Sequence, residues 1–212
     1  MQDTSYIAED SDGEEVVRAF EIALLGVTPR GLSVFQPDPD KDLSAEWDLW
    51  LSDWFAPTIA PAFVKIYSLA ERFRIREVKE ADHELDTALS EDLRSGSLGA
   101  AESFLEGKSR MRHHPEWNRF VNWIGEGKTP GHVLTLAALQ AVLFHLPLAP
   151  ALLAYARFEF QSGVRKSTGW GEEEKESLFL KVLPQVQVAV RAKIDHISPD
   201  QTDNESSGLQ SI

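Results

Sequence analysis

The longest nearly uncharged stretch of the chain lies between residues 129 and 165, and its apolar residues cover almost every face of the helices that they predict. A helix that is apolar on all sides is a buried one. Pro147 and Pro150 divide the stretch, so neither half reaches the ~20 apolar residues that a membrane span needs. The pattern predicts a buried helical hairpin, whose first helix is capped by Thr129 with Pro130 in its first turn and whose second helix begins at Pro150.

Outside this hairpin, apolar residues recur every three or four positions, which is the spacing of a buried stripe on a helix. No stretch alternates for long enough to predict a strand. Proline and glycine give the expected boundaries: a turn at Pro57 and Pro61, a left-handed helix cap at Gly96, and a kink at Pro184. We predict an all-α, single-domain bundle of about eight to ten helices around the buried central hairpin. The further helices are expected within residues 11–24, 44–55, 62–76, 78–93, 98–105, 115–124 and 172–194.

The composition is that of an ordinary soluble globular protein, with 42% hydrophobic and 26% charged residues among 212. One domain is the expectation at this length. The two ends are polar and poor in apolar residues. We therefore predict a disordered acidic segment at residues 1–12, a helical domain at residues 13–197 and a disordered tail at residues 198–212.

The chain carries 21 Lys and Arg against 34 Asp and Glu, a formal net charge of −13. A charge of this sign disfavours binding to a phosphate backbone and favours a basic partner. The absence of cysteine excludes disulfides and thiolate catalysis and is compatible with a reducing cytosol. The first residues lack the apolar core of a signal peptide. We expect a cytoplasmic protein that binds neither nucleic acid nor a membrane.

Nucleotide and hydrolase motifs are missing from the sequence. There is no GxxxxGK[ST] phosphate loop and no GxSxG serine motif, so the protein is not expected to be a GTPase or a serine hydrolase. Asp82, His83 and Asp86 share a helix face, and His113 stands next to His114, but neither group has the HExxH or HxxxH spacing of a metal site. A metal-dependent hydrolase that uses these residues is the least favoured alternative.

Two further features allow a structural and a functional interpretation. His132 lies in the first turn of the buried hairpin, where the helix dipole lowers its pKa and a polar partner is needed. This position of His132 is equally consistent with a packing role and with a functional role. Trp47, Trp50 and Trp54 form one helical stripe, for which we favour core packing over a docking surface.

The polar end of the hairpin is the best candidate for a binding site. Arg157, Gln161 and Arg165 are four residues apart and share one face, with Tyr155 nearby. Arg and Tyr are enriched at interfaces because they combine buried area with directed hydrogen bonds. The candidate partner-binding residues are His132, Tyr155, Arg157, Gln161, Arg165 and Glu172.

The hairpin and its flanks also resemble a known family. The segments that carry the resemblance are Gly131-His132, Leu146-Pro147-Leu148, residues 152–155, residues 161–165, the stretch 85–105 before the hairpin, and Gly171, 178–180 and Leu183-Pro184 after it. In order and spacing they are similar to the urease accessory protein of the F type, over roughly residues 43–190. The family's usual N-terminal Pro-x-Gly-Gly-Phe segment and Ser-Gly-Leu-Glu helix are absent, so the N-terminal quarter of the chain is unmatched.

The resemblance implies a non-enzymatic, all-helical homodimer that acts in urease maturation. Such a protein binds the D/H-type urease accessory protein and recruits the G-type urease GTPase, so that nickel passes to apo-urease. Nickel is then cargo, and no tightly bound cofactor is expected. The family uses the region of the hairpin's polar end for self-association and for assembling its GTPase. The alternative is a helical adaptor unrelated to urease.

Overall fold

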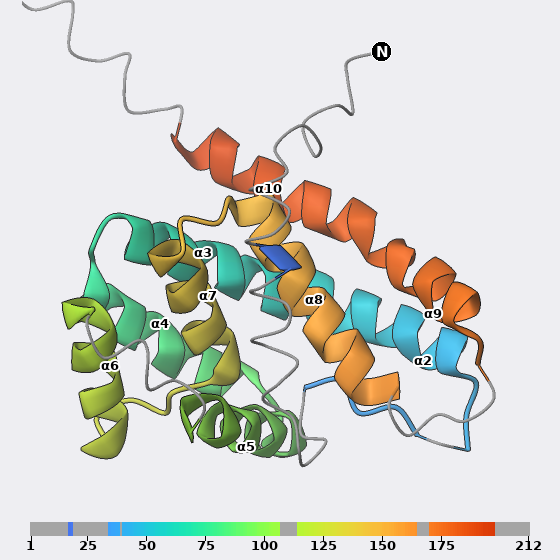
Figure 1. Ribbon diagram of the computed structural model, residues 1–212, viewed down its shortest axis with the longest axis horizontal. Helices are drawn as coiled ribbons and strands as arrows, with labels where there is room; N and C mark the ends of the chain where they lie inside the picture. The colour runs from blue at the N-terminus through green and yellow to red at the C-terminus, as the bar shows by residue number, and fades with distance from the viewer. Residues whose placement is uncertain (1–16, 19–33, 39, 107–113, 165–169, 198–212) are drawn as a thin grey trace, which may run out of the picture.

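The computed structural model describes residues 17–18, 34–38, 40–106, 114–164 and 170–197 (Figure 1). Every secondary-structure element in these segments is a helix, so the all-α prediction is confirmed. The predicted segments 1–12 and 198–212 lie outside the described residues, as does most of the helix expected within 11–24. The elements are α2 (Leu43–Trp50), a π-helix (Leu51–Ile59), α3 (Ala60–Glu71), α4 (Ile75–Ala88), α5 (Glu91–Glu106), α6 (Pro115–Gly125), α7 (Val133–Leu143), α8 (Leu148–Val164), α9 (Glu172–Phe179), a 3₁₀ turn (Leu180–Val182) and α10 (Leu183–Ile197).

The described residues form seven continuous helical segments, slightly fewer than the eight to ten predicted, because two predicted breaks are helical. The turn predicted at Pro57 and Pro61 is wrong. The chain stays helical there by widening into a π-helix, in which the N–H of Ala60 donates to the carbonyl of Phe55, five residues earlier. This change of partner accommodates Pro57, which has no N–H to donate. Before Pro184 the helix instead tightens into the 3₁₀ turn and then continues as α10.

The left-handed cap predicted at Gly96 is also wrong. Gly96 is buried in the middle of α5, and the break between α4 and α5 falls at Leu89, whose backbone is extended. A left-handed residue lies earlier, between α3 and α4, where Phe73 has a φ of 57°. The N–H of Arg74 donates to the carbonyl of Leu69 at this turn, which is the pattern of a Schellman motif.

The buried central hairpin is present. All nine residues from Val133 to Ala141 in α7 are buried, and α7 packs against α3, α5 and α8 (Figure 1). Its predicted boundaries need correction. Helix α7 begins at Val133 with His132 as its N-cap, so Thr129 is not the cap, and α8 begins at Leu148 rather than at Pro150.

Helix α10 closes the bundle by packing against α3 and α8. Helix α9 opens the last helical segment, on the right in Figure 1, and is joined to α8 by the contact between Arg157 and Glu176. Within the described segments, no helix is both long enough and apolar enough to cross a membrane.

Candidate functional site

Arg157 joins α8 to α9 through a defined set of contacts. Its Nη1 and Nη2 donate to the two carboxylate oxygens of Glu176, at 2.6 and 2.9 Å. The guanidinium also lies over the ring of Phe179, with Cζ 4.1 Å from the ring centroid. The hydrogen bond from Arg157 lowers the pKa of Glu176. A two-pronged ion pair and a cation–π contact together hold the guanidinium in one orientation.

A surface cavity of about 300 Å³ opens beside this pair. We call the polar residues that line it the α8–α9 surface: Arg157, Gln161, Glu172, Lys175 and Glu176. Gln161 follows Arg157 by one helical turn, as the four-residue spacing predicts, and is half-buried. The side chain of Glu172 is 92% exposed and accepts a hydrogen bond from Lys175 Nζ at 2.9 Å. The structure thus brings together three of the six predicted residues. Arg165 lies outside the described residues.

Tyr155 is not part of this surface. It is fully buried, and its hydroxyl donates to Glu159 Oε1 at 2.6 Å. The other oxygen of Glu159 accepts the backbone N–H of Phe35 at 3.0 Å, and Glu159 is itself fully buried. Burial, and then the nearby Glu159 carboxylate, raise the pKa of Tyr155 well above its ordinary value. Glu159 therefore anchors the segment around Phe35 to α8 from inside the core, and the Tyr155 hydroxyl holds Glu159 in place.

His132 lies in a different part of the molecule, at the start of α7. Its backbone N–H donates to Asp82 Oδ1 at 3.1 Å, and its ring nitrogens lie 3.1 Å from Ser97 Oγ and 3.1 Å from Asp86 Oδ1. The side chain has no exposed surface, and this burial lowers the pKa of His132, although Asp82 and Asp86 both oppose the shift. The cause differs from the predicted helix dipole. These contacts fit the structural interpretation of His132, as a hydrogen-bonded packing residue, and its role in partner binding stays a prediction.

Asp82 is the centre of this buried group. Its Oδ2 accepts Thr129 Oγ1 at 2.7 Å and the Gly131 N–H at 2.6 Å, and its Oδ1 accepts the His132 N–H and Thr135 Oγ1, the latter at 2.6 Å. Two of these donors are backbone groups at the start of α7, where helical N–H groups have no partner within the helix. Asp82 is thus a long-range cap supplied by α4. We call Asp82 and its four partners the Asp82 cluster.

The residues that a metal-dependent hydrolase would use make separate structural contacts. Asp86 pairs with Arg94 Nε at 3.2 Å, and His83 Nε2 lies 3.0 Å from the carbonyl of Lys128. His114 is the N-cap of α6, and His113 lies outside the described residues. Where side chains are described, no group of three or more His, Cys, Asp or Glu residues is placed to hold a metal ion.

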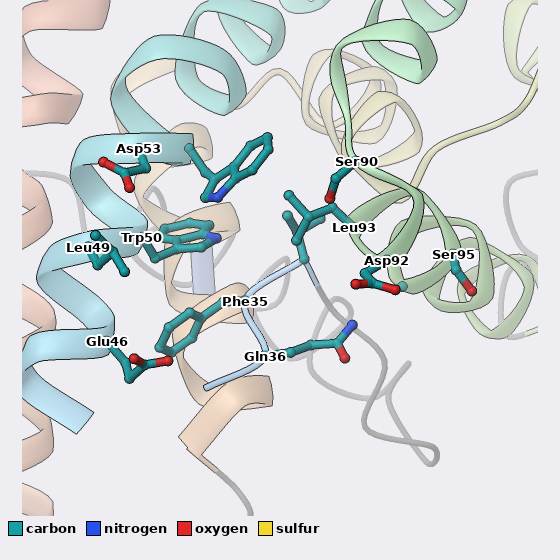
Figure 2. Close-up of a pocket in the computed structure, with 13 residues that line it drawn as sticks. Phe35, Gln36, Glu46, Leu49, Trp50, Asp53, Ser90, Asp92, Leu93 and Ser95 are labelled. Carbon is teal, nitrogen blue, oxygen red and sulfur yellow. The ribbon is translucent and has the colours of Figure 1, made fainter. Parts of the chain in front are cut away.

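The tryptophan stripe packs into the core, as favoured. Trp47 and Trp50 are 0% and 5% exposed, and Trp54 is half-buried. The ring of Trp47 lies 4.8 Å from that of Phe160 on α8, between centroids. Trp50 also lines a larger cavity, shown in Figure 2.

The sequence did not reveal two features of the structure: the pair of Arg157 with Glu176 and the buried hydrogen bonds of Asp82. Glu176, the partner of Arg157, lies 19 residues away across segment 165–169, and no spacing rule connects them. For Asp82, the sequence gives only a weak indication of a buried role. It falls beside Ala81 and four residues after Val78, so it lies on the buried face of α4. A carboxylate in an apolar stripe needs buried donors.

A comparison with protein families gives one match. The family model described as UreF matches residues 41–159, more than half of the chain. The matched span begins just before α2 and ends within α8, so it includes the Asp82 cluster, Tyr155 and Arg157. It excludes residues 1–40, in agreement with the missing motif, and it ends before Gln161 and Glu172. No curated protein matches the chain.

Proposed function

Because the chain belongs to the UreF family of urease accessory proteins, we propose that it is a non-enzymatic scaffold for urease maturation. In this proposal it binds the D/H-type accessory protein and recruits the G-type urease GTPase, so that nickel is delivered to apo-urease. Nickel is cargo that the GTPase carries, and the scaffold itself neither binds nor hydrolyses GTP.

The α8–α9 surface is the proposed recruitment site, and the observation that supports it most is the fixed orientation of Arg157. Its guanidinium is held by Glu176 and Phe179 before any partner arrives. A group that is already ordered loses little conformational entropy on binding. Glu172 and Lys175 add one charge of each sign to the rim of the cavity. Such a surface recognises a partner with complementary charges rather than any polyanion.

We also propose that the protein is a homodimer, as is expected for the family. Light scattering at tens of micromolar should give a mass near twice the chain mass of 23.7 kDa. A single species at the mass of one chain over this range would contradict the dimer and leave the recruitment site as a separate proposal.

Urease activation in cells tests the recruitment site. Glu172→Lys reverses a charge on the cavity rim at a side chain that is 92% exposed, so the fold should tolerate it. The matched control is Glu102→Lys, the same change at an exposed position of α5. Cells that carry urease genes and the Glu172→Lys protein should lose most urease activity, while its soluble level stays normal. The control should activate urease normally.

Two outcomes would reject the α8–α9 surface as the recruitment site. The first is normal activation by Glu172→Lys. The second is an equal loss with Glu102→Lys, which would show that the total charge of the protein matters and that this surface does not.

A further inference from the structure

A second cavity, which the proposed function does not use, lies between α2 with its π-helix and the first turn of α5. Its volume is about 520 Å³, within the range of ligand pockets in proteins (Figure 2). Apolar side chains, including Trp50 and Leu93, form part of its lining. Leu49 is 55% exposed at its edge. A partly apolar cavity with an exposed leucine at its edge is a candidate docking site.

The charges that line this cavity all have one sign. Glu46 and Asp53 come from the α2 side and Asp92 from α5, and no Lys or Arg belongs to the described lining (Figure 2). The contacts recorded for these carboxylates use only part of their capacity to accept hydrogen bonds. Asp53 Oδ1 accepts Ser52 Oγ at 2.9 Å, while Glu46 lies 3.7 Å from Lys41 Nζ and accepts the Asp38 N–H at 3.4 Å. Asp92 is in the first turn of α5, where it also complements the helix dipole.

Trp50 supplies an independent sign of a missing partner. Its ring nitrogen is buried and has no hydrogen-bond partner among the described residues, although the side chain is only 5% exposed. Buried indole N–H groups usually find an acceptor. Figure 2 shows this nitrogen on the edge of the ring that faces Leu93 across the cavity. A backbone carbonyl that enters the cavity would be a suitable acceptor.

We propose that this cavity binds an arginine side chain from a basic segment of a partner protein. The guanidinium pairs with a carboxylate of the rim and packs on the half-buried Trp54, while a carbonyl of the same segment accepts the Trp50 N–H. Arginine fits better than lysine because its flat guanidinium stacks on aromatic rings. The net charge of −13 attracts a basic segment over a longer range and repels nucleic acid.

The test uses a short blocked peptide, Gly-Arg-Gly-Arg-Gly, and the full chain labelled with ¹⁵N in its tryptophans. Six tryptophans give six indole N–H signals, and Trp54→Phe assigns one of them. Addition of the peptide should shift two indole signals, that of Trp54 and one more that belongs to Trp50, with a dissociation constant below about 1 mM. The lysine version of the peptide should bind more weakly, and the glutamate version should cause no shift.

Matched variants separate a local site from general charge attraction. Asp53→Asn with Asp92→Asn removes two rim charges from exposed side chains and should weaken peptide binding about tenfold. Glu80→Gln with Glu102→Gln removes two exposed charges elsewhere and should change binding less than twofold.

Three results would overturn the proposal: no indole shift at saturating arginine peptide, equal binding by the Asp53 and Asp92 variant, or equal weakening by the control variant. Glu172→Lys should bind the peptide normally, so a failure of the α8–α9 proposal leaves this test unaffected.

Discussion

The Asp82 cluster and the α8–α9 surface are both built around a charged side chain held between helices, yet they differ in access to solvent. Asp82 is fully buried, and all four of its hydrogen bonds are made inside the protein. Arg157 makes an equally specific pair with Glu176, but Glu176 is 48% exposed and a cavity opens beside it. Removing a buried carboxylate leaves its buried donors without a partner, whereas an ordered charge at the edge of a cavity is available to a partner protein. The difference predicts that changes in the first region reduce stability and that changes in the second reduce binding.

Asp82→Ala should give the largest loss of stability. It leaves two backbone N–H groups and two hydroxyls without their acceptor in the core. Each buried donor without a partner costs about 1–3 kcal/mol, so the free energy of unfolding should fall by about 3 kcal/mol or more. Urea unfolding measures it, with the exposed Asp53→Ala as control at about 0.5 kcal/mol or less. A loss below about 1 kcal/mol for Asp82→Ala would remove the distinction between the two regions.

Gly131→Ala should be next in size. Gly131 has a φ of 78°, and an added Cβ would lie 2.5 Å from Cδ1 of Ile124. The left-handed backbone and the overlap each cost about 1–2 kcal/mol. Thermal or urea unfolding should show a loss of about 2 kcal/mol or more. Gly125→Ala is the matched control, because a Cβ added there would meet no atom within 4 Å and its φ is not left-handed. Equal losses for both variants would show that the loop is not held in this conformation.

The pH dependence of stability should follow His132. Burial lowers its pKa in the folded protein below the ordinary value of 6.5, against the opposing effect of Asp82 and Asp86 and with the support of Arg94. The unfolded chain therefore takes up this proton first as the pH falls. The contribution of His132 to the free energy of unfolding is therefore fully present above about pH 6.5. It decreases as the pH falls from there to the lowered pKa.

The free energy of unfolding measured from about pH 8 to about pH 5.5 checks this prediction. His132→Gln should be less stable at neutral pH and should show a shallower decrease toward acid, because the titrating group is gone. An identical slope in the variant would assign the pH dependence to other groups.

Arg157→Ala should have a small effect on stability. A partly exposed ion pair contributes about 0–1 kcal/mol and a cation–π contact of this kind about 0.5–1 kcal/mol. The free energy of unfolding should therefore fall by about 0.5–2 kcal/mol, which is less than for Asp82→Ala. Arg157→Lys keeps the charge but loses the two-pronged geometry. It should therefore recruit the GTPase little better than Arg157→Ala does. A loss as large as that of Asp82→Ala would place Arg157 with the structural residues.

The sequence predicts the helical class, the buried hairpin and the core position of the tryptophan stripe because these depend on periodicity. It fails at Pro57 and Gly96 because tertiary packing decided those boundaries: a π-helix accommodates the proline, and the glycine is buried within α5. Thr129 looked like a cap on local grounds, but Asp82, 47 residues earlier, supplies that function.

The candidate site was predictable only in part. A spacing of four residues places Arg157 and Gln161 on one face, and the structure keeps them together at the cavity. Helical spacing alone does not separate Tyr155 from that face, because which side of α8 is covered depends on helices distant in sequence. The contact of Arg157 with Glu176 depends on how α9 docks, which no local pattern encodes.

Titration calorimetry with the purified G-type GTPase, in the presence of the D/H-type accessory protein, tests the central claim most directly. The scaffold proposal predicts that Glu172→Lys weakens GTPase binding at least tenfold while its free energy of unfolding falls by no more than about 1–2 kcal/mol, the cost of losing the Lys175 pair and an acidic residue in the first turn of α9. Glu102→Lys should leave both quantities unchanged. GTPase binding by Glu172→Lys with the affinity of the unaltered protein would contradict the assignment of the α8–α9 surface as the recruitment site.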